Sequence, residues 1–182
     1  MFLFNKIKFL FINRNNKNKV RYLRKAGATI GEGTRLLCGV SSFGTEPYLI
    51  SVGKDCLLTG GISIVTHDGG VSVLNNLNMF NEIKMDKVAP VEIGNNVFIG
   101  AKTIIMPGVK IGNNVIIGAG SIVARNIPDN SVAAGVPAKV LKSVDEYYAD
   151  AMEKGLFFES IGMGYEEKKK YLLNEIKKRA CK

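Results

Sequence analysis

The chain has 182 residues, of which 46% are hydrophobic and 23% charged, which argues against global disorder and against a second full domain. Its formal net charge is +9, with 25 Lys and Arg against 16 Asp and Glu. The three cysteines, Cys38, Cys56 and Cys181, share no CxxC spacing. This pattern argues against a zinc finger and a disulfide framework and is typical of a reduced, cytoplasmic protein.

Residues 1–27 form a basic segment, because no acidic residue precedes Glu32. Its hydrophobic stretch at 1–12 is interrupted by Asn5, Lys6 and Lys8, so it is too short to span a bilayer. We expect this segment to dock on the protein's own body and to cap one end of it. An amphipathic helix in peripheral contact with a membrane is the alternative. Nucleic-acid binding is not expected, since few aromatic side chains interleave the basic run.

A repeat of six residues follows the basic segment. Residues 93–128 divide into IGNNVF, IGAKTI, IMPGVK, IGNNVI, IGAGSI and VARNIP, and looser copies begin at Ile30, Val52, Leu58 and Ile64. This period fits neither an amphipathic helix nor plain alternation. Three hexapeptides predict one triangular coil of about 18 residues, and stacked coils bury the column of first residues. The sequence therefore predicts a mainly β fold, a parallel β-helix over residues 28–142.

The sixth residue of each hexapeptide is expected to point outward. Residues one coil apart share a face, so the pattern stacks Phe98 on Ile116, Ile104 on Ile122 and Lys110 on Pro128. Two faces of the β-helix are then apolar, which favours a subunit interface or a covering helix.

The repeat stops after the segment THDGG at 66–70 and resumes near Val91. The intervening loop, residues 69–90, is rich in apolar residues, and we expect it to be packed and functional. Residues 143–182 are predicted to form a helical extension. A capping box at Ser143–Glu146 begins a short helix that ends at Gly155, and a second helix runs from about Tyr165 to Arg179.

These hexapeptides, with THDGG at 66–70, GTEPYL at 44–49 and AAGVPAKV at 133–140, resemble the hexapeptide-repeat acyltransferases. The resemblance covers residues 28–142 and is greatest to sugar O-acetyltransferases of the galactoside, maltose and capsular-polysaccharide kinds. It implies a left-handed coil, which is an exception to the usual right-handed crossover. It also implies a homotrimer with active sites between neighbouring subunits, and acetyl-CoA as co-substrate without a metal.

In such enzymes a histidine at the edge of a protruding loop takes the proton of the acceptor hydroxyl as its oxygen attacks the thioester. His67 is the only histidine of the chain, and it lies where the β-helix gives way to the loop. The resemblance therefore implies His67 as the general base, a role that suits imidazole near neutral pH. Glu46, Asp68 or a backbone carbonyl can orient its ring, and we favour Glu46.

The resemblance also implies where acetyl-CoA binds, along a groove between two subunits. The positions that match the contacts with its pantetheine are Gly100, Ala101, Gly118 and Ala119. Arg125, Lys139 and Lys142 match the region that holds its phosphates, where a cation suits an anion. Phe98 falls where some sugar acetyltransferases carry a tryptophan.

The expected function is acetyl transfer to a hydroxyl of a sugar or polysaccharide precursor. An N-acetyltransferase of an amino sugar or nucleotide sugar is the first alternative, and a non-catalytic β-helical assembly module is an alternative of another class. A carbonic anhydrase of the γ type is set aside, because its zinc requires three histidines and this chain has one.

Overall fold

The structure is a computed structural model that describes residues 12–180. The hydrophobic stretch before Ile12, with its expected amphipathic helix, and Cys181 lie outside these residues. The chain divides into two compact units, residues 1–145 and residues 146–182, which are described separately.

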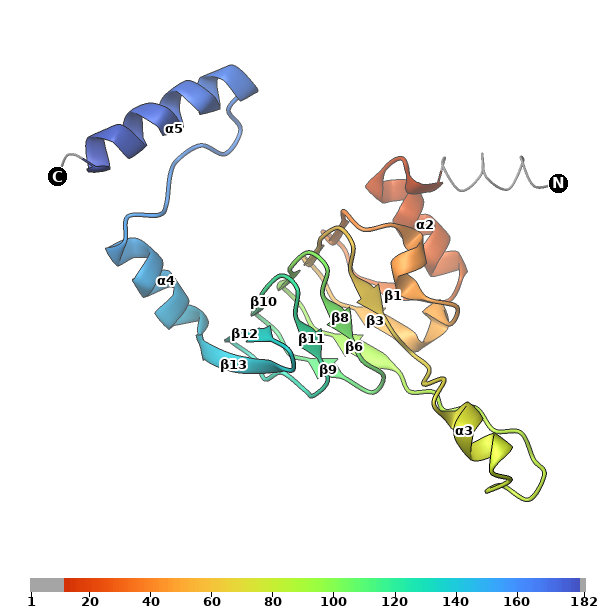
Figure 1. The fold of residues 1–182 in the computed structure, drawn as a ribbon. Helices are drawn as coiled ribbons and strands as arrows, with labels where there is room; N and C mark the ends of the chain where they lie inside the picture. The colour runs from red at the N-terminus through yellow and green to blue at the C-terminus, as the bar shows by residue number, and fades with distance from the viewer. Residues whose placement is uncertain (1–11, 181–182) are drawn as a thin grey trace. The chain divides into compact units, whose positions relative to one another are not determined.

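The first unit is a parallel β-helix whose short strands form three sheets (Figure 1). The first sheet has the order β1 (Thr29–Ile30), β3 (Ile50–Val52), β6 (Val91–Ile93) and β9 (Lys110–Ile111). The second has β13 (Ala138–Ser143), β12 (Ser131–Gly135), β10 (Val115–Ile117), β7 (Val97–Ile99), β4 (Leu57–Leu58) and β2 (Arg35–Leu36). The third has β11 (Ile122–Val123), β8 (Ile104–Ile105) and β5 (Ser63–Ile64). The predicted parallel β-helix is confirmed.

The core is the interior of this prism. Leu58, Ile99 and Ile117 lie above one another on the second sheet, and each is fully buried. Thr103 and Ser121 are buried among these apolar side chains, and their hydroxyls donate to the carbonyl oxygen of Gly118 at 3.3 and 2.6 Å. The small fifth residues of the hexapeptides therefore fill the interior without an unsatisfied hydroxyl.

The corners explain why glycine and asparagine recur in the hexapeptides. A Cβ on Gly53 would lie 2.5 Å from the carbonyl oxygen of Gly94 in the next coil, so the coils can stack only without a side chain there. Asn96 and Asn114 have φ of 53° and 54°, a left-handed conformation that asparagine tolerates. Their side chains are joined by a hydrogen bond of 3.0 Å between successive coils.

The last coil differs from the prediction. Phe98 does pair with Ile116, as expected, but Ile116 pairs with Val132, only sixteen positions later. Lys110 therefore does not stack on Pro128. Its backbone N–H donates to the side chain of Asn126, sixteen positions later. The predicted stack of Lys110 on Pro128 is therefore wrong.

This shortening occurs at one corner. Val123 and Ile127, which both point inward, are four positions apart, whereas Ile105 and Ile111 are six apart at the same corner of the preceding coil. The other expected apolar stack, Ile104 on Ile122, is confirmed.

Helix α2 (Asn16–Lys25) lies over the first coil (Figure 1). Its Leu23 is fully buried, and the side chain of Lys19 is nearly so. The ammonium of Lys19 donates to the carbonyl oxygens of Leu36 at 2.7 Å and Cys38 at 2.9 Å. Carbonyl groups at the open end of the β-helix are thereby satisfied by a side chain of the basic segment.

The C-terminal end holds a hairpin and two helices. Strand β13 pairs antiparallel with β12, which the sequence did not indicate. Helices α4 (Val144–Glu153) and α5 (Tyr165–Ala180) confirm the two predicted helices. Within the second unit, the guanidinium of Arg179 lies 4.1 Å from the centre of the Phe158 ring and donates to the carbonyl oxygen of Phe157 at 3.2 Å. This cation–π contact ties α5 to the segment that follows α4.

The loop of residues 69–90 protrudes from the β-helix and contains helix α3 (Val71–Asn76), as Figure 1 shows. Within it, the side chain of Asn75 exchanges hydrogen bonds of 2.8 and 2.9 Å with the backbone of Met85. Val71 is buried, but most of the loop's large apolar side chains are exposed, namely Val73, Leu74, Leu77, Met79, Ile83, Met85 and Val88. The expectation of a packed loop is therefore wrong for the single chain, because the loop extends away from the coils.

Candidate active site

His67 lies at the neck of the protruding loop. It stands opposite Val88 in an isolated antiparallel bridge, in which Asp68 N–H donates to Lys87 and Ala89 N–H donates to Thr66, both at 2.8 Å. Two arms of the chain thus hold the backbone of His67. Its side chain remains 51% exposed, so an external molecule can reach the ring.

Glu46 comes from the preceding coil, between two short 3₁₀ turns, η1 (Val40–Phe43) and η2 (Pro47–Leu49). Its Oε2 lies 2.9 Å from Nδ1 of His67 and accepts the hydroxyl of buried Thr66 at 2.7 Å. Its Oε1 accepts the hydroxyl of Thr45 at 2.6 Å. The structure therefore brings His67 and Glu46 together and adds two threonines that the sequence analysis did not single out. Thr45 directly precedes Glu46, and Thr66 directly precedes His67. This adjacency is the one signal in the sequence that pointed to the two threonines.

These hydrogen bonds decide the charge of Glu46. Donation from Thr45, then from Thr66 and His67, lowers the pKa of Glu46 to about 2. The carboxylate therefore stays ionised at neutral pH and is protonated only as the pH falls toward that value. Because an ionised carboxylate can only accept, Nδ1 of His67 carries the hydrogen, and Nε2 is the basic nitrogen of the neutral ring.

Asp68 has different partners. Its carboxylate pairs with the ammonium of Lys87 at 2.7 Å and accepts the backbone N–H of Gly70 at 2.9 Å. The hydrogen bond from Lys87, followed by that from Gly70, lowers the pKa of Asp68. Among the described contacts, Asp68 thus joins the two arms of the loop and does not face the ring of His67.

The four small residues expected to contact acetyl-CoA lie together at one corner, between the second and third sheets. A Cβ on Gly100 would lie 2.4 Å from the backbone nitrogen of Ala119, and one on Gly118 would lie 2.7 Å from Cβ of Ala134. The stacking of the coils by itself thus requires these glycines. Ala101 and Ala119 are exposed at the turn.

The three cations expected near the phosphates are divided between two places. Arg125 is exposed on the corner that follows β11, whereas Lys139 and Lys142 belong to β13 at the end of the second sheet. Among the contacts described for residues 12–180, none joins these cations, or the small-residue corner, to His67 of the same chain.

Known proteins share this architecture. A family model described as "Bacterial transferase hexapeptide (six repeats)" matches residues 90–125. Protein CapG of Staphylococcus aureus is 44% identical over 170 residues, which cover 93% of this chain and 95% of that protein. Galactoside O-acetyltransferase of Escherichia coli (strain K12) is 34% identical over 103 residues, covering 56% of this chain and 47% of that enzyme.

A solved structure of a maltose O-acetyltransferase from Clostridium difficile 630 is 29% identical, with a TM-score of 0.53, and the match covers 70% of this chain and 75% of that one. The left-handed form of the β-helix, which the sequence resemblance implied, is confirmed by these matches. The near-complete match to one relative places the whole chain in a single family. This protein belongs to the hexapeptide-repeat transferase family and is an acetyltransferase of that family.

Proposed function

We propose that this protein transfers an acetyl group from acetyl-CoA to a hydroxyl of a sugar or polysaccharide precursor, with His67 as general base. The observation that carries the proposal is the pairing of half-exposed His67 with ionised Glu46 across 2.9 Å. The names of two similar proteins, a galactoside and a maltose O-acetyltransferase, support a sugar hydroxyl as the acceptor.

His67 would act through Nε2, since Nδ1 is bound to Glu46. Nε2 takes the proton of the acceptor hydroxyl while the oxygen attacks the thioester carbonyl, and it returns that proton to the sulfur as the carbon–sulfur bond breaks. The products are an acetyl ester and a free thiol. The carboxylate of Glu46 holds the ring in orientation and stabilises the imidazolium that forms between the two proton transfers.

A site shared between subunits of a homotrimer accounts for the distribution of the other expected residues. The small-residue corner and the cations Arg125, Lys139 and Lys142 would bind acetyl-CoA beside His67 of a neighbouring copy. Two features support this arrangement: the exposed apolar side chains of the 69–90 loop, and the side chain of Phe98, which is 38% exposed on the apolar face of the second sheet.

Replacing Glu46 by glutamine is expected to lower kcat by about tenfold to a hundredfold, because the neutral amide no longer stabilises the imidazolium. Steady-state kinetics at saturating acetyl-CoA measures the effect. Asp68→Asn is the matched control, because that carboxylate faces Lys87, and an equal loss of kcat in both variants would contradict the role of Glu46.

The acceptor class is tested by following thiol release from acetyl-CoA with galactosides, maltose, nucleotide sugars and amino sugars. We expect release with neutral sugars and an ester product that hydroxylamine cleaves. An amide product formed only with amino sugars would favour the N-acetyltransferase alternative. Absence of acetyl-CoA binding by calorimetry would contradict catalysis and favour the assembly module.

A cytoplasmic location at the inner face of a membrane, with peripheral contact through the basic N-terminal segment, stays a prediction. Among residues 12–180, no helix combines the length and the apolar character that crossing a bilayer would need. The described part of the segment exposes several cations, namely Arg14, Lys17, Arg21, Arg24 and Lys25.

A further inference from the structure

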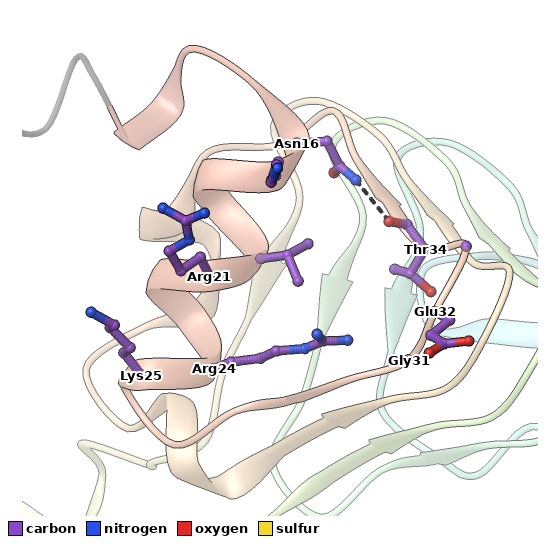
Figure 2. A pocket seen from close by; sticks show the side chains of 10 residues that line it. Asn16, Arg21, Arg24, Lys25, Gly31, Glu32 and Thr34 are labelled. Atoms are coloured by element: carbon purple, nitrogen blue, oxygen red, sulfur yellow. Dashed lines mark hydrogen bonds between the residues drawn. The ribbon is translucent and has the colours of Figure 1, made fainter.

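A basic hollow of about 640 Å³ lies between helix α2 and the first coil, and its lining includes neither His67 nor Glu46 (Figure 2). Its volume is in the range of small-molecule sites. Four cations and a single acidic residue are among the residues that line it: Lys17, Arg21, Arg24 and Lys25, with Glu32. The hollow is therefore strongly positive.

Three of these cations have no anionic partner in the described chain. Lys17, Arg21 and Lys25 follow one another at intervals of four residues, so they share one side of α2. All three are exposed, and none forms an ion pair with any residue from 12 to 180. Like charges at this spacing repel and destabilise a helix. The negative C-terminal end of the helix dipole stabilises the cation of Lys25 in the last turn. It does not stabilise Lys17 and Arg21, which lie nearer the start of the helix.

Arg24 is held in place across the hollow. Its Nε donates to the carbonyl oxygen of Ile30 at 3.1 Å, and its Nη2 donates to the same oxygen. Figure 2 shows its side chain reaching from α2 toward the chain at Gly31 and Glu32. A guanidinium that is already oriented loses little conformational entropy when it binds a further anion.

The neutral polar groups of the wall are already engaged. The side-chain amide of Asn16 donates to the carbonyl oxygen of Thr34 at 2.9 Å and accepts the N–H of Leu36 at 2.7 Å. The hydroxyl of Thr34 donates to the carbonyl oxygen of Gly53 at 2.7 Å. The hollow therefore offers a ligand cationic donors above all, which favours an anion over a neutral sugar.

We propose that this hollow binds a phosphate or diphosphate group, with Lys17, Arg21 and Lys25 as its charged contacts and Arg24 as a fixed wall. Phosphate carries several charges and acceptor oxygens, which match guanidinium and ammonium donors. The group can belong to a soluble phosphorylated molecule or to a lipid headgroup. None of the lining residues belongs to the acetyl-transfer site, so the inference goes beyond the proposed function.

The test is calorimetric titration of the full-length protein with inorganic pyrophosphate, at low salt and again near physiological salt. The combined variant Lys17→Gln, Arg21→Gln and Lys25→Gln is expected to raise the Kd by about tenfold or more, because each change removes a charge-assisted contact. The control is Lys168→Gln, Lys170→Gln and Lys177→Gln on α5, which changes the net charge equally and should leave the Kd as it is.

Folding and activity separate this inference from the proposed function. Neutralising the three cations removes repulsion within α2, so the thermal midpoint should not fall, and thiol release with the best acceptor should be unchanged. The single variant Arg21→Gln serves if the combined variant fails to fold. Absence of pyrophosphate binding by the wild type, or equal weakening in both triple variants, would overturn the proposal whatever the result for acetyl transfer.

Sedimentation with phosphatidylglycerol vesicles distinguishes the two sources of phosphate. In one outcome the wild type sediments with the vesicles, and both the triple glutamine substitution on α2 and added pyrophosphate abolish this recovery. That result identifies a lipid headgroup as the ligand in the hollow. Pyrophosphate binding with the protein left in the supernatant identifies a soluble phosphorylated ligand. Recovery that pyrophosphate does not compete away, by a protein that does not bind pyrophosphate, indicates a flat membrane contact and contradicts the hollow as a site.

Discussion

The variant His67→Ala is expected to lose acceptor-dependent thiol release by about 10²- to 10⁴-fold in kcat, the usual contribution of a positioned general base. Alanine leaves no group that can take the hydroxyl proton. Neither Thr66 nor Glu46 can replace it, since the threonine hydroxyl is a poor base and the carboxylate keeps the hydrogen bonds from Thr45 and Thr66, the largest causes of its lowered pKa. Single-turnover kinetics at saturating acetyl-CoA measures the effect on the chemical step.

The variant should remain folded and should bind acetyl-CoA with unchanged affinity, because the His67 side chain is half exposed and supports no core packing. Asp68→Ala is a matched control at the neighbouring position, and we expect it to retain most of the activity. Retention of activity in His67→Ala, or an equal loss in Asp68→Ala through disruption of the loop, would contradict the general-base role.

The variant Lys19→Met is expected to lower the free energy of unfolding by about 2–4 kcal/mol, since two buried carbonyl groups lose their donor. Methionine keeps the length and the apolar part of the side chain. The loss therefore falls on the carbonyl oxygens of Leu36 and Cys38, which the ammonium now satisfies at 2.7 and 2.9 Å. Urea denaturation followed by circular dichroism provides the measurement.

Lys25→Met is the control for Lys19, because it removes the same charge from an exposed position of the same helix. Its effect should be within about 0.5 kcal/mol, as for most surface substitutions. Equal midpoints for the two variants would show that water replaces the ammonium at the end of the β-helix and that α2 does not cap it in the way described.

Much of the fold could be predicted because the residues within each hexapeptide by themselves indicate which side chain is buried and where the chain turns. Ile99 and Ile117 begin repeats and lie in the core, and the left-handed conformation at Asn96 and Asn114 follows from residues within the turn. The register of the last coil could not be predicted in this way. Ile127 points inward whether the coil has its full length or is two residues shorter, so only its pairing with Ile111 distinguishes the two.

The candidate site shows the same division. The position of His67 at the end of the repeat followed from the sequence, which favoured Glu46 over Asp68 as the partner of the ring but left Asp68 as an alternative. The antiparallel bridge at the loop neck sets this choice, because successive side chains of an extended segment point to opposite sides. Asp68 therefore turns to Lys87, while His67 faces the preceding coil, which carries Glu46.

By itself, the sequence determined the repeat, the residues that line its core, the turns that glycine and asparagine permit, and the loop that begins directly after His67. These features are local, since each depends on residues within about one hexapeptide of one another. The tertiary structure decided the shortened coil, the capping of the first coil by Lys19 and the pairing of His67 with Glu46. Each of these joins residues 16 to 21 positions apart, and only the stacking of one coil on the next, or of α2 on the first, sets which atoms meet.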